Sequence, residues 1–249
     1  MIARRLRHTL YITAMVFCCV VTAQSDETLY LAMAEDWKPY VYLDANGKAA
    51  GDDFSLLQRT LTSMQYELMA VDLPEQRLGR DIFRGHVDVT LGAVSTPERR
   101  EQNYFSIPYR LETIVFAYRK SVHPDWQDKG LEQILQQQEL IAVNNSGWFG
   151  DWFRYHIQET YPTQLIHAEG TLRRMQLLKM GRVSAVIGDI HVLQDAAWEL
   201  GITDLQIGAA VINQTPVHFM FSRLRVDADF MKRFNQALKQ QLDANVKLP

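Results

Sequence analysis

The residues Thr96-Pro97-Glu98-Arg99 combine the features of a helix start with a guanidinium group. Threonine is a good N-cap, proline is favoured at the first helical position, and glutamate suits the positive end of the helix dipole. A helix that begins here presents backbone N–H groups together with the Arg99 guanidinium, a combination that binds carboxylates. An ordinary capped helix with Arg99 on the surface fits the same spacing, so both interpretations stay open.

A carboxylate stands at the end of an apolar run later in the chain. Residues 185–188 predict a buried strand, Asp189 follows it directly, and residues 190–200 predict a helix that Gly201 ends. Ligands of open α/β sheets bind at the carboxyl ends of strands, so Asp189 is a candidate partner for a ligand ammonium group. The alternative is that Asp189 only caps the following helix.

Aromatic side chains accompany both candidates. Trp37 lies just after the first predicted strand, 29–33, where its ring could stack on a ligand. Packing in the core or at its rim explains Trp37 equally well. Trp148 follows a turn at 146–147 and could line the opposite wall, but we predict a helix over 148–160, where an aromatic residue more often belongs to the core.

No known catalytic or metal-binding motif occurs in the chain. There is no Gly-x-Ser-x-Gly elbow, phosphate-binding glycine loop or His-Glu-x-x-His sequence. The histidines do not have the spacing of metal ligands. We therefore expect no catalytic residues, no metal and no cofactor.

The N-terminal residues predict an export signal. A basic segment over 4–8 precedes the apolar run 9–21, and small residues at 21–23 suit cleavage after residue 23. An uncleaved anchor is the alternative, although the run is short for a membrane span, which needs about 20 residues. Both cysteines, Cys18 and Cys19, lie in this signal, so we expect no disulfides in the mature chain.

The mature chain predicted by this cleavage is acidic. It has 226 residues, of which 23 are basic and 29 acidic, giving a net charge of −6. This balance argues against nucleic acid or an anionic membrane surface as a partner. We expect a soluble, monomeric protein in the periplasm.

Strand-like and helix-like segments alternate along the mature chain, which predicts an α/β fold. A second unit of similar kind begins near Ser121, and the chain crosses between the two units twice. Two crossings suit lobes that close over a ligand about a double hinge.

Six segments, in their order along the chain, resemble the amino-acid-type (family 3) periplasmic solute-binding proteins of ABC importers. The resemblance runs from about Leu29 to the final helix, and the segments 96–99 and 105–109 together are its most specific part. The six segments are Trp37 to Tyr40, Asn46 to Phe54, Gly85 to Asp88, Thr96 to Arg99, Phe105 to Tyr109 and Gly181 to Asp189.

The resemblance implies a two-lobed α/β fold of the type II periplasmic-binding-protein kind. The first lobe would hold residues 26–118 and 216–249, and the second lobe residues 121–211. The double hinge would lie near 118–121 and 211–216.

The resemblance also implies roles for single residues. Arg99, in the motif that Thr96 begins, would hold the ligand carboxylate, and Asp189 would take its ammonium group. Trp37 would cover the ligand from the first lobe. The loop Ser146-Gly147, followed by Trp148, would contact it from the second.

Three further features of the sequence bear on this assignment. The segment Pro74 to Arg77 resembles a Pro-x-x-Arg variant of one branch, so Arg77 is expected to face the cleft. Many members have serine or threonine two residues before the threonine of the motif, where this chain has Val94 in the predicted site. Gly147 also stands where threonine is frequent, so both changes alter the polar contacts open to a ligand.

The function that the resemblance implies is capture of a small amino-acid-like or carboxylate ligand for uptake through an ABC permease. Two alternatives remain open. One is an enzyme on the same fold, of the cyclohexadienyl dehydratase type. The other is a sensory binding protein that delivers its ligand signal to a receptor instead of an importer.

Overall fold

The computed structural model describes residues 27–34, 36–145 and 147–245 of the chain. The predicted export signal and Ser146 lie outside the described residues. Within the described part, no helix is long and apolar enough to cross a membrane.

One large mixed sheet runs through the molecule in the order β10-β9-β11-β8-β13-β6-β1-β5, and β12 and β7 pair with β8 and β13 beside this path. A second, small sheet has the order β2-β3-β4. The strands are β1 (Glu27–Met33), β2 (Asp36–Trp37), β3 (Val41–Leu43), β4 (Ala49–Ala50), β5 (Tyr66–Asp72), β6 (Val89–Val94), β7 (Asn103–Phe105), β8 (Arg110–Arg119), β9 (Ile141–Val143), β10 (Leu165–His167), β11 (Ala185–Asp189), β12 (Leu205–Ile207) and β13 (Asn213–Ser222).

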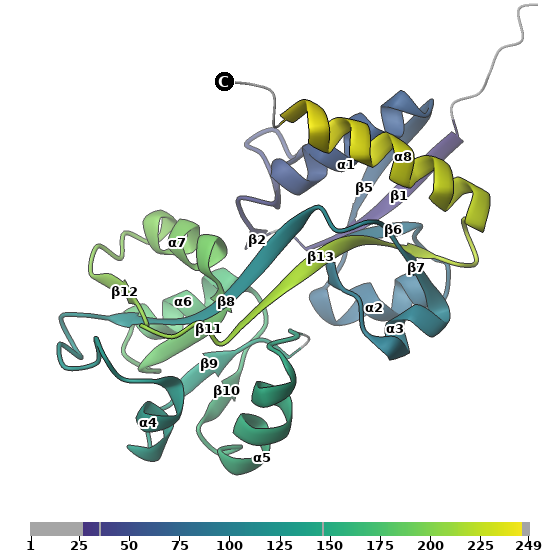
Figure 1. Ribbon diagram of the computed structural model, residues 1–249. Helices are drawn as coiled ribbons and strands as arrows, with labels where there is room; N and C mark the ends of the chain where they lie inside the picture. The colour runs from purple at the N-terminus through teal and green to yellow at the C-terminus, as the bar shows by residue number, and fades with distance from the viewer. Residues whose placement is uncertain (1–26, 35, 146, 246–249) are drawn as a thin grey trace, which may run out of the picture.

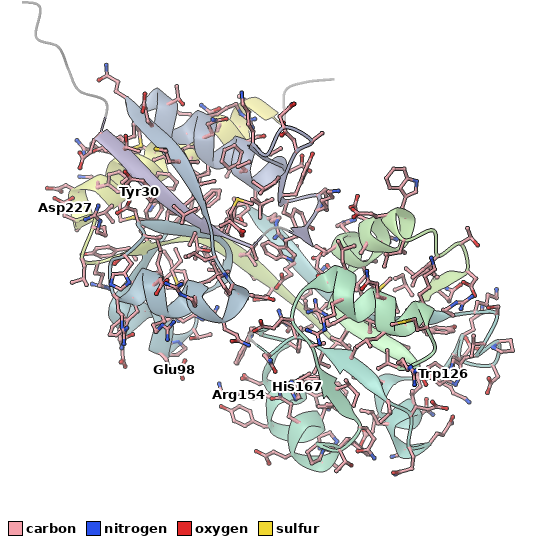
Figure 2. All side chains as sticks on the ribbon, turned by 180° about the vertical axis from the view of Figure 1, so that it is seen from behind. Tyr30, Glu98, Trp126, Arg154, His167 and Asp227 are labelled. Atoms are coloured by element: carbon pink, nitrogen blue, oxygen red, sulfur yellow. The ribbon has the colours of Figure 1, made fainter. Side chains whose placement is uncertain are left out.

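Helices cover both faces of this sheet at each of its ends, giving two α/β units joined by the long strands β8 and β13 (Figure 1). The helices are α1 (Asp52–Ser63), α2 (Glu75–Phe83), α3 (Pro97–Gln102), α4 (Leu131–Gln136), a π-helical turn (Phe153–Ile157), α5 (Gln158–Thr160), α6 (Thr171–Lys179), α7 (Ile190–Glu199) and α8 (Ala228–Asn245). Figure 2 labels Tyr30, Glu98 and Asp227 on one unit and Trp126, Arg154 and His167 on the other.

The first unit buries both faces of its strands. Successive strand residues point to opposite faces, so Leu31 packs in the same core as the α1 and α8 residues Leu57 and Phe234. Its neighbour Ala32 packs on the other face with Ile82 of α2. The near-continuous apolar character of β1 follows from this burial on two sides.

The second unit repeats the arrangement with the other half of β8. Phe116 packs in a core with Leu135 of α4, while its neighbour Ala117 packs in a core with Met175 of α6 and Leu193 of α7. The α/β, two-unit architecture predicted from the sequence is confirmed.

The first crossing between the units lies earlier in the chain than the hinge we predicted near 118–121. β8 pairs with β13 over residues 110–114 and with β11 over residues 114–118. Because Ile114, Phe116 and Tyr118 pack in the second unit, the first unit ends before residue 114 and not at 118. The return runs through β13, whose pairing with β8 begins at Asn213 inside the predicted second hinge.

The predicted helix over 148–160 also begins later than expected. Helical structure starts at Asp151, because Gly150 has a φ of 91°, outside the helical region. Trp148 and Phe149 consequently lie in an irregular segment, which frees their side chains from the helical pattern.

Candidate ligand-binding site

A cavity of about 310 Å³ lies between the two units. It is lined by residues at the carboxyl ends of two parallel pairs of strands, β1 with β6 and β9 with β11. This is the place where open α/β sheets bind ligands, and the volume suits a small molecule. The charged side chains in its lining are Glu75, Arg99, Glu112, Arg174 and Asp189.

Arg99 reaches the cavity from the first turn of α3. The Thr96 hydroxyl accepts a hydrogen bond from the Arg99 backbone N–H at 3.3 Å, so the predicted cap is present. The guanidinium donates from Nη1 to the Val94 carbonyl oxygen at 3.1 Å, and it forms no ion pair with any described carboxylate. Burial lowers the pKa of Arg99, although the nearby Glu112 opposes the shift. Arginine stays protonated nonetheless, so the cavity holds a cation that no described carboxylate contacts within ion-pair distance.

Asp189 lines the cavity and also caps α7. Its Oδ1 accepts hydrogen bonds from the backbone N–H groups of His191 and Val192 at 2.9 and 3.3 Å, which confirms the cap interpretation. The same oxygen accepts from the Tyr40 hydroxyl at 3.1 Å, and Oδ2 accepts from the Thr113 N–H at 3.3 Å. Four protein donors therefore already occupy this carboxylate, against about four acceptor positions in total.

A buried ion pair supports the hinge strand behind Asp189. Arg110 donates from Nε to both Asp53 oxygens, at 3.2 and 3.0 Å, and its guanidinium lies 3.6 Å from the Tyr40 ring centre. The Tyr109 hydroxyl donates to Asp53 at 2.6 Å. Nη1 of Arg110 lies 4.0 Å from Asp189, so this cation also partly balances the Asp189 charge.

Glu112 enters the cavity from β8. Residues two apart on a strand share a face, so Glu112 and Ile114 both line the cavity. Glu112 is only 8% exposed, yet its carboxyl group forms no hydrogen bond or ion pair with a described residue. Burial, then the charges of Asp189 and Asp53, raises its pKa to about 7, against the opposing effect of Arg110 and Arg99.

Trp37 forms part of the wall by lying directly on Gly92. A Cβ atom at Gly92 would stand 2.0 Å from Cη2 of the indole, and the φ of Gly92 is 63°. Both facts require glycine here, because a side chain would collide with the ring and strain the backbone. The predicted aromatic cover is thus in contact with the cavity.

The second unit contributes Gly147, Trp148 and Phe149 from the irregular segment before Asp151. It also contributes Arg174 of α6, which donates from Nη1 to the Ala168 carbonyl oxygen at 3.1 Å and from Nη2 to the Thr171 hydroxyl at 3.0 Å. Arg174 was not anticipated, because an arginine in a helical pattern is usually solvated.

The structure gathers most of the predicted site residues around one cavity. Arg99, Asp189, Trp37, Val94, Gly147 and Trp148 line it. Thr96 does not line it and acts as the cap that positions Arg99. Ser146 lies outside the described residues.

Arg77 is a correction. We expected it to face the cleft, but its Nη2 pairs with Asp81 at 2.9 Å on the same helix, and nearly half of its side chain is exposed. The first turn of α2 turns Glu75, Gln76 and Leu78 toward the cavity instead. Residue 77 lies between them in sequence but on another side of the helix, since each residue advances about 100°.

No group of three His, Cys, Asp or Glu side chains in the described part of the chain is arranged to hold a metal ion. Besides the five charged side chains, the polar lining of the cavity includes Gln76, Thr90, Asn144 and Thr171.

Two α/β units that share two strands and enclose a cavity at their strand ends define a bilobed ligand-binding protein. Residues 29–247 match the family of bacterial extracellular solute-binding proteins, family 3, and the chain belongs to this family. The resemblance seen in the sequence is confirmed, and membership implies a periplasmic location.

The relatives include a transport protein and an enzyme. The chain is 24% identical to ABC transporter arginine-binding protein 1 of Escherichia coli over 94% of this chain and 90% of that one. It is 35% identical to the cyclohexadienyl dehydratase of Pseudomonas aeruginosa over 48% of this chain. That match spans 44% of the dehydratase, which is less than half of its length. A crystal structure of a mutant ArgBP from T. maritima has the same fold, with a TM-score of 0.75 and 21% identity over 88% of this chain and 91% of that one.

Proposed function

We propose that the protein captures a small amino-acid-like carboxylate between its two units and delivers it to an ABC permease. The observation that carries this proposal is the Arg99 guanidinium, which lines the cavity with no described carboxylate as partner. A partly buried cation is costly unless an anion compensates it, and a ligand carboxylate can do so through a bidentate pair. The arginine-binding relative supports an amino acid as the cargo.

The apolar walls suit the rest of such a ligand. Trp37 lies on one side, and Trp148 and Phe149 lie on the other. Aromatic rings bury aliphatic or aromatic ligand groups with little loss of side-chain freedom. Resemblance to the family assigns Arg99 to the ligand carboxylate. It assigns Trp37, Gly147 and Trp148 to the walls that cover the ligand.

Contacts between the two units explain how capture is signalled. Nζ of Lys38 lies 2.8 Å from Oε2 of Glu199, and the Asn144 amide donates to the Glu75 carboxylate. A ligand that touches both units adds to these contacts and favours the closed arrangement by its differential affinity for that state. The permease would bind the surface formed on closure, with the protein acting as a monomer.

The test is a thermal-shift screen of the mature protein with the common L-amino acids and small carboxylic acids. A ligand at about 100 times its Kd stabilises the folded state by about 2.7 kcal/mol. We expect Arg99→Ala to lose this stabilisation while it still folds, and the neighbouring Arg100→Ala, on the exposed side of α3, to keep it. Equal stabilisation of Arg99→Ala and the parent protein would exclude Arg99 as the carboxylate anchor.

A second function is favoured by two observations together. The dehydratase relative matches half of the chain, and Glu112 offers a carboxyl group with a pKa near 7 in the cavity, as a general acid requires. Including prephenate, a cyclohexadienyl dicarboxylate, in the screen separates the two functions. Its conversion would favour catalysis, whereas simple binding of amino acids would favour transport.

A further inference from the structure

The three carboxylates in the cavity differ in what already binds them. Asp189 accepts four protein hydrogen bonds, and Glu75 accepts one from Asn144. The carboxyl group of Glu112 has no hydrogen-bond or ion-pair partner among the described residues. Of the three, Glu112 therefore has the most acceptor capacity left for a ligand.

The position of Glu112 makes its carboxylate oxygens accessible from the cavity, where a ligand would bind. The residue is more than nine-tenths buried, and it lines the cavity from β8, opposite Thr215 of β13. It therefore lies on one of the two strands that join the units and faces the other. A group bound there contacts the hinge directly.

Burying an acid without a hydrogen-bond or ion-pair partner is unfavourable, and the charges of Arg110 and Arg99 offset this cost only in part. A cationic ligand group in contact with Glu112 would reduce the cost further. Isolated carboxylates in apolar surroundings either take up a proton or acquire a positive partner. The raised pKa of Glu112 corresponds to the first response. A bound ammonium group would produce the second.

We propose that Glu112 is the residue that binds the cationic group of the ligand, while Arg99 binds its carboxylate. The proposal rests on the proposed function and deepens it. Two opposite charges line one cavity, neither has an ion-pair partner in the described chain, and a zwitterion supplies both partners at once. Asp189 then has a positioning role, because it caps α7 and holds Tyr40.

This assignment differs from the role that family resemblance gives to Asp189. It also predicts a proton balance. A ligand ammonium binds the carboxylate form of Glu112, so the fraction of Glu112 that carries a proton near neutral pH releases that proton to the buffer on binding. Binding of the ammonium group at Asp189 would release less, because the ammonium would then act on Glu112 only from a distance.

The test pairs each common L-amino acid with the carboxylic acid that lacks only its α-amino group, for example L-valine with 3-methylbutanoate and L-alanine with propanoate. Kd values are measured by calorimetry at neutral pH in two buffers of different ionisation enthalpy. We expect the parent protein to bind its best amino acid at least about tenfold more tightly than the matched acid, since a hydrogen bond to a charged group contributes at least this much.

Glu112→Gln should lose most of this discrimination and all of the proton release, while it still binds the plain acid. Glu101→Gln, an exposed change on α3, is the matched control and should keep both. Asp189→Asn should lose less of the discrimination than Glu112→Gln, because asparagine keeps the oxygen that caps α7.

The outcomes separate the two proposals. If amino acids bind but Glu112→Gln discriminates as the parent does, or Asp189→Asn alone loses discrimination, the assignment of Glu112 is wrong. If the parent prefers the plain acids, it is wrong as well. If no member of either series binds the parent protein, the proposed function fails and the role of Glu112 fails with it.

Discussion

Glu112 is the residue through which the cavity is most sensitive to pH. Burial raises its pKa to about 7 from the ordinary value of 4.5, against Arg110 and Arg99 and with the help of Asp189 and Asp53. At a pH between these two pKa values, Glu112 keeps its proton in the folded protein but has lost it in the unfolded chain. The free energy of unfolding therefore falls as the pH rises through this window.

We expect Glu112→Gln to remove this pH dependence, because glutamine does not ionise. The variant and the parent should have similar stability near pH 4.5, and at about pH 8 the variant should be more stable by up to about 3 kcal/mol, at about 1.4 kcal/mol per pKa unit. Urea unfolding at several pH values measures the difference. A constant difference between the two proteins across the window would show that Glu112 does not titrate as described.

For single residues, the sequence predicts the site residues that belong to a motif and misses those that do not. Arg99 and Trp37 were found because each follows a strand in a recognisable segment. In the sequence, Glu112 stands just before the apolar run 113–118, and nothing in the neighbouring residues distinguishes it from a surface acid. Its importance arises from the absence of a partner in three dimensions, which no local pattern encodes.

Among the elements, α3 matters because it holds Arg99 in place. It has six residues, too few to be stable by itself, so its cap contributes a large part of its order. The sequence predicted this helix start correctly, since cap residues act over three or four neighbours.

We expect Thr96→Ala to cost about 1 kcal/mol of stability and to weaken ligand binding less than Arg99→Ala does, because the guanidinium stays but loses its fixed position. Thr96→Ser, which keeps the hydroxyl, should restore both properties. Thermal unfolding and ligand titration of the three variants provide the measurement. Loss of binding in Thr96→Ser equal to that in Thr96→Ala would mean that the hydroxyl is not what positions Arg99.

The strands β8 and β13 show where prediction from sequence ends. The apolar run 113–118 predicts a buried strand, but the unit to which this strand belongs depends on which strand pairs with it. β8 changes partner from β13 to β11 at residue 114, and the apolar pattern is the same on both sides of that point. The point at which β8 changes partner therefore lies several residues before the first hinge predicted near 118–121.

The whole molecule consists of two separately packed units that close on one cavity. The ion pair Lys38–Glu199 is one of the side-chain contacts that cross between them. Both side chains are more than a third exposed, so the pair adds little to stability and is weakened by salt. We expect the Lys38–Glu199 ion pair to affect mainly the equilibrium between the open and closed forms of the protein.

We expect Lys38→Ala to leave the unfolding temperature nearly unchanged, to increase the radius of gyration of the ligand-free protein, and to weaken ligand binding by about twofold. Added salt should affect the parent more than the variant. Small-angle scattering and titration at two salt concentrations check this. Glu199→Ala should have the same effect, and the double variant no greater one; additive losses would show that the two residues act independently.

The contact between Trp37 and Gly92 limits how the protein can evolve. Any larger residue at position 92 collides with the indole, so that substitution is harmful before any gain can appear. A smaller residue at position 37 meets no such obstacle and enlarges the cavity at once. Adaptation to bulkier cargo in this lineage can therefore begin at residue 37, whereas the positive φ of residue 92 continues to favour glycine there afterwards.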